Sequence, residues 1–323
     1  MSTCSVSFIV PYYQISACLL KRCLDSLLAV AATTDCEVIL VDDGTPDTKV
    51  PSWLVDWQME KKVRYHYQEN KGLGGARNTG MKLAIKEYIQ FVDPDDYLIA
   101  EHYAAVWSLL QEKRPDLLAF DFRMVYDVEP KTVVPCRSVL YEGSGVHFMC
   151  SHNLRAGACF YLFRRTLAAG LLFLEHTYHE DEAFTPLLYL RAQILIATRI
   201  PLYAYYQRED SIMNSPDRGK LHRRFSDFLK IQQSLTALLP TLSHRQQMAL
   251  RRRVDQNYMS MVYKLLTDSP DRSFLQPYLQ EMKQLGVYPL PVRLYTLKYF
   301  LFAGLTACPG MLMILRRLLR GRR

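Results

Sequence analysis

The sequence of 323 residues lacks the cysteine patterns that mark disulfide scaffolds and zinc proteins. Its eight cysteines show no metal-ligand spacing, and their density is too low for disulfides to replace a core. We therefore expect reduced thiols. The first residues also lack a charged segment followed by a long apolar run, so we expect no secretory signal and a cytoplasmic protein.

Internal repeats and low-complexity segments are also absent. Apolar residues make up 49% of the chain, which excludes a disordered protein and allows one large domain or two smaller ones. The net charge of +8 is uneven, because the final "ILRRLLRGRR" holds five arginines and no acid. Such a tail is attracted to anionic surfaces, either phospholipid or nucleic acid.

Apolar, β-branched segments alternate with amphipathic ones over the first hundred residues. Strands that are apolar on both faces are typical of a parallel sheet covered by helices on both sides. The pattern predicts strands at 5–10, 36–41, 62–68 and 87–92 and helices at 16–31 and 74–86. Further on we expect a helix after residue 100, strands near 116–127 and 130–140, and a mixed extension of the sheet to about 208.

From Asp217 the periodicity is that of long helices, so we expect an α/β domain at 1–215 and a helical region at 216–323. That region includes "YFLFAGLTACPGMLMIL", seventeen residues without a charge. A spanning helix needs about 20 apolar residues, and a Pro-Gly pair interrupts this segment, so we expect no span. Two alternatives stay open for 290–323: helices packed on the catalytic domain, or a monotopic anchor on an anionic membrane surface.

Each predicted early strand ends in a polar or glycine-rich segment, in chain order "PYYQ", "DDGT", "ENKGLGGARN" and "DPDD". The carboxyl ends of parallel strands meet at one edge of an open sheet, where ligands bind. The sequence therefore predicts that four strand ends line one crevice and that this crevice is the active site.

The segment "VDPDDY" places Asp93, Asp95 and Asp96 within four positions. Carboxylate oxygens suit a hard divalent cation, Mg²⁺ or Mn²⁺, and Mg²⁺ needs only one or two carboxylates when substrate phosphate completes its coordination. The alternative is structural, because aspartate caps helices and proline begins them.

The segment "NKGLGGARNTG" differs from the dinucleotide-binding fingerprint, which follows the first strand and ends in glycine. Here the glycines follow the third strand, and Arg77 occupies the place of the last one, so the pattern disfavours a Rossmann dehydrogenase. A flexible turn leading into a helix would leave Lys71 and Arg77 available to an anion or a base edge. A purely structural turn is the alternative.

Two further acidic segments allow both kinds of interpretation. Asp43 in "VDDGT" either belongs to an Asp-Gly turn or accepts a hydrogen bond from a pyrimidine or ribose, with Tyr12 or Tyr13 beside it. Glu180 and Asp181 in "YHEDEAF" either favour a helix start through the helix dipole or supply a general base for a hydroxyl nucleophile.

In order and spacing, these segments, together with "YYQREDSIMN", resemble the family 2 glycosyltransferases of the GT-A fold that build bacterial cell-surface polysaccharides. The resemblance covers residues 5–215. It implies a Rossmann-like, mostly parallel sheet with flanking helices. It also implies an inverting transfer of a sugar from a nucleoside diphosphate, with UDP the expected nucleotide, to a hydroxyl of a glycan or lipid-linked acceptor.

The resemblance also implies roles for single residues. Asp93 and Asp95 would hold a divalent metal together with the donor diphosphate and ribose, and Asp96 would close this cluster. Asp181 would be the catalytic base and Glu180 its partner. We expect the donor to be bound by Pro11, Tyr12, Asp43, Lys71, Arg77, Asn78, Asp93, Arg208 and Ser211.

Two other functions stay open. A membrane-docked binding protein of the same fold should have lost a metal-binding or base acid, and none is lost here. A sugar nucleotidylyltransferase should carry a glycine-rich, basic segment after the first strand, where this chain has "PYYQ". We expect a peripheral protein at the inner face of the cytoplasmic membrane with no nucleic-acid partner, while the sugar stays open because "DPDD" and "YYQ" depart from the commoner family pattern.

Overall fold

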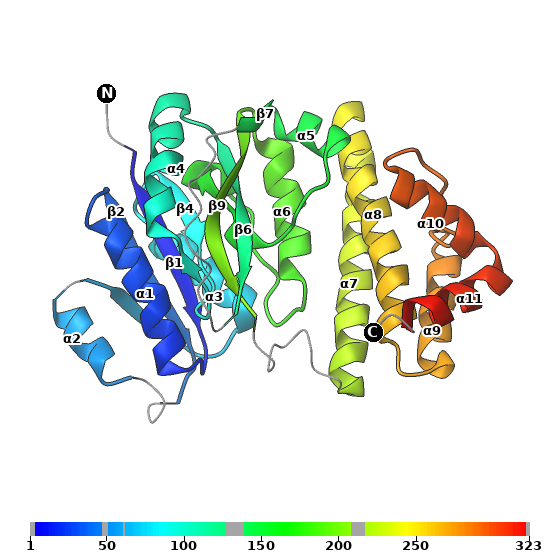
Figure 1. Cartoon of the computed structure of the whole chain (residues 1–323), viewed down its shortest axis with the longest axis horizontal. Coiled ribbons are helices and arrows are strands. Elements are labelled where there is room, and N and C mark those ends of the chain that lie inside the picture. Colours follow the sequence, from blue (N-terminus) through cyan, green and yellow to red (C-terminus); the bar gives the residue numbers. More distant parts are fainter. Residues whose placement is uncertain (1–3, 47–50, 61, 127–138, 208–216, 321–323) are drawn as a thin grey trace. The chain divides into compact units, whose positions relative to one another are not determined.

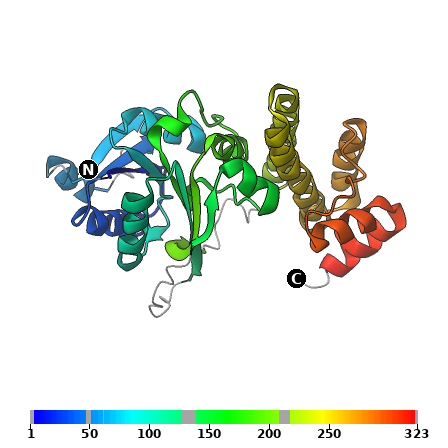
Figure 2. The same cartoon turned by 90° about the horizontal axis from the view of Figure 1, so that it is seen from above.

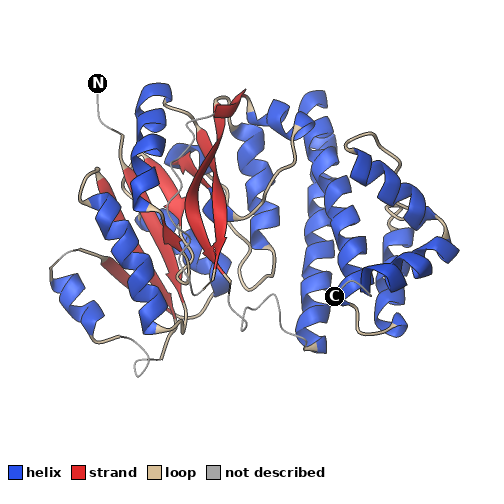
Figure 3. Cartoon of the chain, viewed as in Figure 1, coloured by secondary structure: helices blue, strands red, loops and turns tan. Residues whose placement is uncertain are grey.

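The computed structural model describes residues 4–46, 51–60, 62–126, 139–207 and 217–320 (Figure 1). Contacts divide the chain into two compact units. Residues 1–148 and 155–215 form the first unit, and residues 149–154 and 216–323 form the second. The first unit is α/β, and the second is helical (Figure 3).

In the residues that the structure describes, the first unit is built on a nine-stranded sheet of order β3-β2-β1-β4-β8-β6-β9-β5, with β7 paired to β9. Neighbouring strands among the first four are parallel, as the apolar pattern predicts. These strands are β1 (Val6–Tyr12), β2 (Cys36–Asp43), β3 (Arg64–Gln68) and β4 (Tyr88–Phe91). Their carboxyl ends therefore lie at the same edge of the sheet.

The remaining strands make the sheet mixed, as the expected extension requires. β8 (Tyr161–Arg164) is antiparallel to both β4 and β6 (Leu117–Val125), whereas β9 (Leu195–Tyr206) is parallel to β6. Two short strands pair antiparallel with β9, namely β5 (Tyr97–Leu98) and β7 (Val139–Gly143). Most of the strand expected near 130–140 lies outside the described residues.

Helices cover both faces of this sheet (Figure 2). α1 (Ala17–Ala31) and α4 (Ala100–Lys113) contact each other on one face. α3 (Gly72–Leu83) and α6 (Glu180–Arg191) lie on the other (Figures 1 and 2). The unit also contains α2 (Trp53–Met59), and α5 (Gly145–Ser151) crosses the boundary between the units.

Side-chain alternation along β1 explains why both faces carry helices. Phe8 belongs to the core that β1 shares with α1 and α4, and its ring meets that of Tyr103 edge to face at 5.8 Å. Ile9 points the opposite way, where it lies against Gly80 of α3. A strand buried on both sides is expected to be apolar at nearly every position, and β1 has one buried polar residue, Ser7, whose hydroxyl donates to Oε1 of Glu37 at 2.5 Å.

The second unit contains five long helices, of which α8 (His244–Asp268) contacts all the others. A capping box of Ser243 and Gln246 begins α8. The others are α7 (Arg218–Leu238), α9 (Arg272–Gln284), α10 (Leu297–Ala307) and α11 (Pro309–Arg320). In the part of the chain that the structure describes, no helix combines the length and apolarity that a membrane span requires.

Candidate active site

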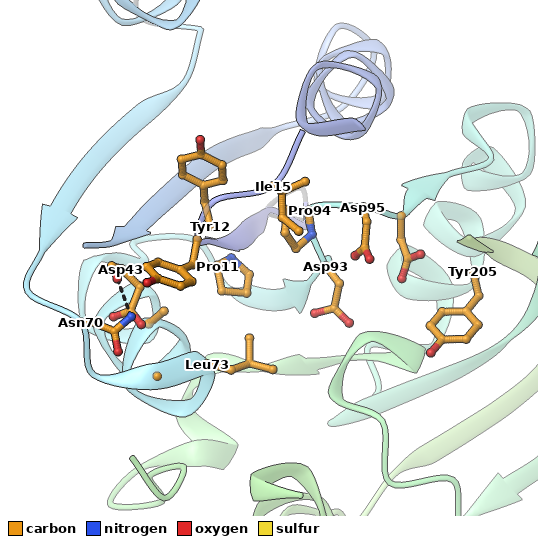
Figure 4. A pocket seen from close by; sticks show the side chains of 14 residues that line it. Pro11, Tyr12, Ile15, Asp43, Asn70, Leu73, Asp93, Pro94, Asp95 and Tyr205 are labelled. Carbon is orange, nitrogen blue, oxygen red and sulfur yellow. Dashed lines mark hydrogen bonds between the residues drawn. The ribbon is translucent and has the colours of Figure 1, made fainter. Parts of the chain in front are cut away.

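A pocket of about 410 Å³ lies where the early strands end (Figure 4). Residues at or just after the ends of β1, β2, β3 and β4 all contribute to its wall, so the predicted convergence of four strand ends is confirmed. The lining residues are Pro11, Tyr12, Tyr13, Ile15, Asp43, Asn70, Gly72, Leu73, Ala76, Asp93, Pro94, Asp95, Asp96 and Tyr205.

One end of the pocket is organised by Asp43, which is buried (Figure 4). Its Oδ1 accepts hydrogen bonds from the side-chain amide of Gln68 at 2.7 Å and from the backbone N–H of Lys71 at 2.8 Å. The side chain of Asn70 donates to the carbonyl oxygen of Asp43 at 2.8 Å. These bonds fix the carboxylate in place, while the nearby ring of Tyr13 is 48% exposed and free to pack against a planar ligand.

The acidic turn after β4 forms the other end of the pocket (Figure 4). The backbone N–H of Asp96 donates to the carbonyl oxygen of Asp93 at 3.1 Å and closes the turn. Asp93 and Asp95 are both partly exposed and both line the pocket. The turn therefore presents two carboxylates to the same space.

Asp96 lies differently from its two neighbours, because its side chain is buried. Its Oδ2 accepts a hydrogen bond from the hydroxyl of Tyr203, and its Oδ1 accepts one from the backbone N–H of Tyr206, both at 2.7 Å. Burial, together with the charges of Asp93 and Asp95, raises the pKa of Asp96 to about 8. Both oxygens are already used to join the turn to β9.

Sequence reasoning missed Arg22 of α1, which also holds this turn. Its Nη2 donates to the carbonyl oxygen of Asp95 at 2.9 Å. Its guanidinium lies 4.8 Å from the ring centre of Tyr97 and 4.4 Å from that of Tyr206. The pattern of α1 gives no sign of this role, because every partner is distant in sequence.

Arg77 connects the acidic turn to α6. This buried side chain donates from Nη2 to Oδ1 of Asp93 at 2.9 Å and from Nη1 to Oε1 of Glu180 at 2.5 Å. Burial alone would lower the pKa of the guanidinium, but the two carboxylates outweigh it and raise the pKa above its ordinary value. Burial raises the pKa of Glu180, and Arg77 opposes that shift.

Asp181 follows Glu180 in the first turn of α6 and is partly exposed. Its Oδ1 accepts a hydrogen bond from the N–H of Glu182 at 2.8 Å. Burial, with the neighbouring charges of Glu180 and Glu182, raises the pKa of Asp181 to about 7. A carboxyl group with a pKa near neutrality is suited to accept a proton during a reaction.

Two glycines allow the segment before α6 to pack against α3. Gly72 has a φ of +74°, a backbone conformation that favours glycine. The helix α3 begins at this residue, so most of the segment expected to be a flexible turn belongs to the first turn of the helix. At Gly74, a Cβ atom would lie 2.3 Å from the carbonyl oxygen of Leu174. These glycines serve close packing between chain segments.

The other expected donor-binding residues take different positions. Asn78 is buried, and its side-chain amide exchanges two hydrogen bonds with the backbone of Phe173, at 2.9 and 2.8 Å. Lys71 bonds to Asp43 through its backbone, and neither Lys71 nor Arg77 is among the described residues that line the pocket. Arg208 and Ser211 lie outside the described residues.

The residues of the acidic turn suit a divalent metal of the kind expected. Among the residues that the structure describes, no three His, Cys, Asp or Glu side chains are grouped as a complete metal site. However, a magnesium ion bound with a substrate diphosphate requires only one or two carboxylates from the protein. Asp93 and Asp95 provide that number of hard oxygen ligands at one end of the pocket.

Residues 7–171, just over half of the chain, match the family model described as glycosyl transferase family 2. The chain belongs to this family. The uncharacterized glycosyltransferase EpsJ of Bacillus subtilis is 31% identical over 221 residues, which are 65% of this chain and 63% of EpsJ. The match thus spans less than two thirds of that family member.

Solved structures of other proteins share the fold of this chain. TarS of S. aureus, in complex with UDP-GlcNAc, superimposes with a TM-score of 0.59 at 20% identity, over 98% of this chain and 86% of TarS. GalNAc-T7 with UDP, GalNAc and Mn²⁺ has a TM-score of 0.50 at 12% identity, over 83% of this chain and 58% of that protein. At these identities the likeness establishes the fold, and the expected GT-A architecture is confirmed.

Proposed function

We propose that the protein is an inverting glycosyltransferase that moves a sugar from a nucleoside-diphosphate donor, with UDP as the nucleotide, to a hydroxyl group. The observation that carries this proposal is the pocket with Asp43 at one end and Asp93 and Asp95 at the other. A nucleotide sugar needs both kinds of contact, a polar group for the base or ribose and a charged site for the diphosphate. The UDP-GlcNAc complex of the similar TarS fold supports this choice of ligand.

In the proposed complex, Asp43 accepts a hydrogen bond from the base or ribose, and Tyr12 and Pro11 line the same end. Asp93 and Asp95 would hold Mg²⁺ or Mn²⁺ together with the diphosphate. When bound, such an ion neutralises the negative charge that develops on the departing diphosphate. We assign Asp96 to holding the turn in place, because both its carboxylate oxygens bond to β9.

Arg77 is proposed as a positioning residue. It fixes Asp93 on the donor side and Glu180 on the acceptor side through two charge-assisted hydrogen bonds. Asn78 is proposed to help position α3 through its two bonds to the backbone of Phe173. Arg208 and Ser211 are proposed, from the sequence resemblance alone, to belong to a segment that closes over the diphosphate.

The reaction then needs one base. Asp181 accepts the proton of the acceptor hydroxyl, and the oxygen attacks the anomeric carbon on the face opposite the diphosphate. The bond from that carbon to the diphosphate breaks, and its electron pair leaves with the nucleotide. A single displacement of this kind inverts the anomeric configuration and requires no covalent intermediate.

We further propose that the acceptor is a glycan or a lipid-linked glycan of a surface polysaccharide, modified at the inner face of the cytoplasmic membrane. The resemblance of the six motifs to glycosyltransferases of that type supports the acceptor class. The domain division proposed from the sequence would then give the chemistry to residues 1–215 and the attachment to residues 216–323.

The test is to incubate the purified protein with a panel of nucleotide sugars and to measure release of the nucleoside diphosphate. We expect release from at least one UDP-sugar, dependent on Mg²⁺ or Mn²⁺ and lost in excess chelator. The Asp95→Asn variant is the matched control. Binding of a nucleotide sugar without any turnover would favour a binding protein. Formation of a nucleotide sugar from a nucleoside triphosphate and a sugar phosphate would favour a nucleotidylyltransferase.

A further inference from the structure

The last helix of the chain, α11, turns apolar residues outward. Met311, Ile314 and Leu318 lie at helical spacing, and all three are exposed. Arg316 is only 6% exposed and donates from Nη2 to the carbonyl oxygen of Ser269 at 3.0 Å. A helix at a water-exposed surface normally has the reverse arrangement, with charges outside and apolar residues inside.

The neighbouring helix α10 also has apolar residues on its outside, although its buried side is mainly apolar as well. Tyr299 and Ala303 are fully buried, while Leu297, Leu301 and Leu305 on other sides of the helix are exposed. α10 and α11 contact each other. We define the docking face as the exposed large apolar residues of α10, α11 and the segment before them: Val292, Leu294, Leu297, Phe300, Leu301, Leu305, Met311, Ile314 and Leu318.

The chain segment that carries the docking face holds charges of one sign. From Met282 to the end of the chain the sequence holds eight lysines and arginines and no aspartate or glutamate. Among them Arg293, Lys298 and Arg317 are exposed. Of these three, Arg293 has an acid close by, with its Nε 4.0 Å from Oδ2 of Asp255. Exposed apolar residues mixed with cations complement the acyl chains and headgroups of anionic lipids.

We propose that the docking face lies in the surface of an anionic phospholipid bilayer. The apolar side chains enter the boundary of the acyl chains, and the cations remain with the headgroups. A second copy of the protein is a poorer occupant, because two such faces would bring like charges together. This inference is independent of the proposed transfer reaction.

The helix lengths indicate that α10 and α11 lie along the membrane and do not cross it. α11 has 12 residues and is thus about 18 Å long, whereas the hydrocarbon core of a bilayer is about 30 Å thick. Deletion of residues 290–323 is a poor test, because it would also remove the buried Leu290 and Tyr299 from the second unit. Point substitutions on the exposed side avoid this problem.

The experiment compares two double variants of the full chain by sedimentation with vesicles. In Leu301→Glu/Ile314→Glu, two exposed residues of the docking face become acidic. The control, Met248→Glu/Met59→Glu, adds the same charge at exposed apolar positions elsewhere, and Met248, at 51% exposure, matches Leu301, at 52%. The vesicles consist of phosphatidylcholine alone or of phosphatidylcholine mixed with phosphatidylglycerol.

We expect the unmodified protein and the control variant to bind the anionic vesicles at low salt and to bind neutral vesicles poorly. Binding of the docking-face variant should be weaker by roughly tenfold or more. Donor hydrolysis should be equal in all three proteins, which separates this test from that of the proposed reaction. If the unmodified protein fails to bind anionic vesicles, or if both double variants bind alike, the inference is wrong. Light scattering that shows a dimer lost only in the docking-face variant would assign the face to a second copy instead.

Discussion

In the first unit the buried guanidinium of Arg77 lies between two carboxylates, whereas in the second unit that of Arg252 lies among neutral oxygens. Arg252 donates to the carbonyl oxygen of Met149 at 2.9 Å and to the side-chain oxygen of Asn153 at 3.0 Å. Accordingly, the carboxylates raise the pKa of Arg77 against burial, and burial lowers the pKa of Arg252.

The two units therefore differ in how they stabilise a buried guanidinium group. Around the pocket, buried ions of opposite sign hold one another in fixed positions, which is what an ordered donor site requires. In the second unit, neutral oxygens accept the hydrogen bonds of Arg252 and Arg316 without neutralising their charge, and apolar side chains remain outside. These buried guanidinium groups of the two units thus differ in whether carboxylates neutralise them.

The largest expected effect is a loss of transfer activity after a substitution in the pocket of the first unit. Asp95→Asn should reduce transfer by about a thousandfold or more, because one of two proposed metal ligands loses its charge. Thermal stability should change little, since Asp95 is partly exposed. The measurement is turnover of a nucleotide sugar, with a melting curve and vesicle binding as controls. A variant that keeps full activity, or an enzyme that works in excess chelator, would contradict the metal assignment.

Next comes the base. Asp181→Asn should lower kcat by about 10²–10⁴-fold, because the proposed base is lost. Donor affinity measured by calorimetry should stay close to that of the unmodified protein. Should donor affinity fall in parallel with turnover, Asp181 would belong to the donor site and the division of roles within the first unit would need revision.

The comparison of the two arginines can be tested directly. Arg77→Met leaves Glu180 and Asp93 without their buried cation, so we expect it to destabilise the protein by about 3–5 kcal/mol. Arg252→Met leaves only neutral acceptors unpaired, with an expected cost of about 1–3 kcal/mol. Chemical denaturation measures both.

A double variant serves as the control for this pair. Arg77→Met combined with Glu180→Gln should be more stable than Arg77→Met alone, because it also removes the buried charge of Glu180 that has lost its partner. Equal costs for Arg77→Met and Arg252→Met, with no recovery in the double variant, would remove the distinction between the units.

The smallest expected effect is a shift in pH dependence. Asp181 accepts a proton only when it is ionised, and its pKa is raised to about 7, so kcat should fall about tenfold per unit as the pH drops below that value. Glu182→Gln removes a charge that raises this pKa, so the falling limb should move to lower pH. A limb that stays in place would indicate that another group controls it.

The sequence predicts the arrangement of the pocket well because parallel strands impose it. Once β1, β2, β3 and β4 are recognised, their carboxyl ends must meet at one edge, where Asp43 ends β2 and Asp93 follows β4. The order of the later strands is less predictable. β8 lies between β4 and β6 and is antiparallel to both, and its short apolar sequence does not indicate in which direction it runs.

Single side chains within the site were predicted less well. The bonds that occupy Asp96 come from Tyr203 and Tyr206, and those of Asn78 come from Phe173, all about a hundred residues away. A local pattern contains no information about such partners. An aspartate in an acidic turn looks the same in sequence whether or not its carboxylate is bonded to a neighbouring strand.

The contact at Gly74 has a consequence for redesign of this protein. Because a Cβ atom there would lie 2.3 Å from the carbonyl oxygen of Leu174, any other residue would have to displace backbone. Leu172 and Leu174, on the same segment, have exposed side chains. A library of variants in this part of the molecule should therefore vary positions 172 and 174 freely and keep glycine at 74, since variation at 74 would yield mostly misfolded members.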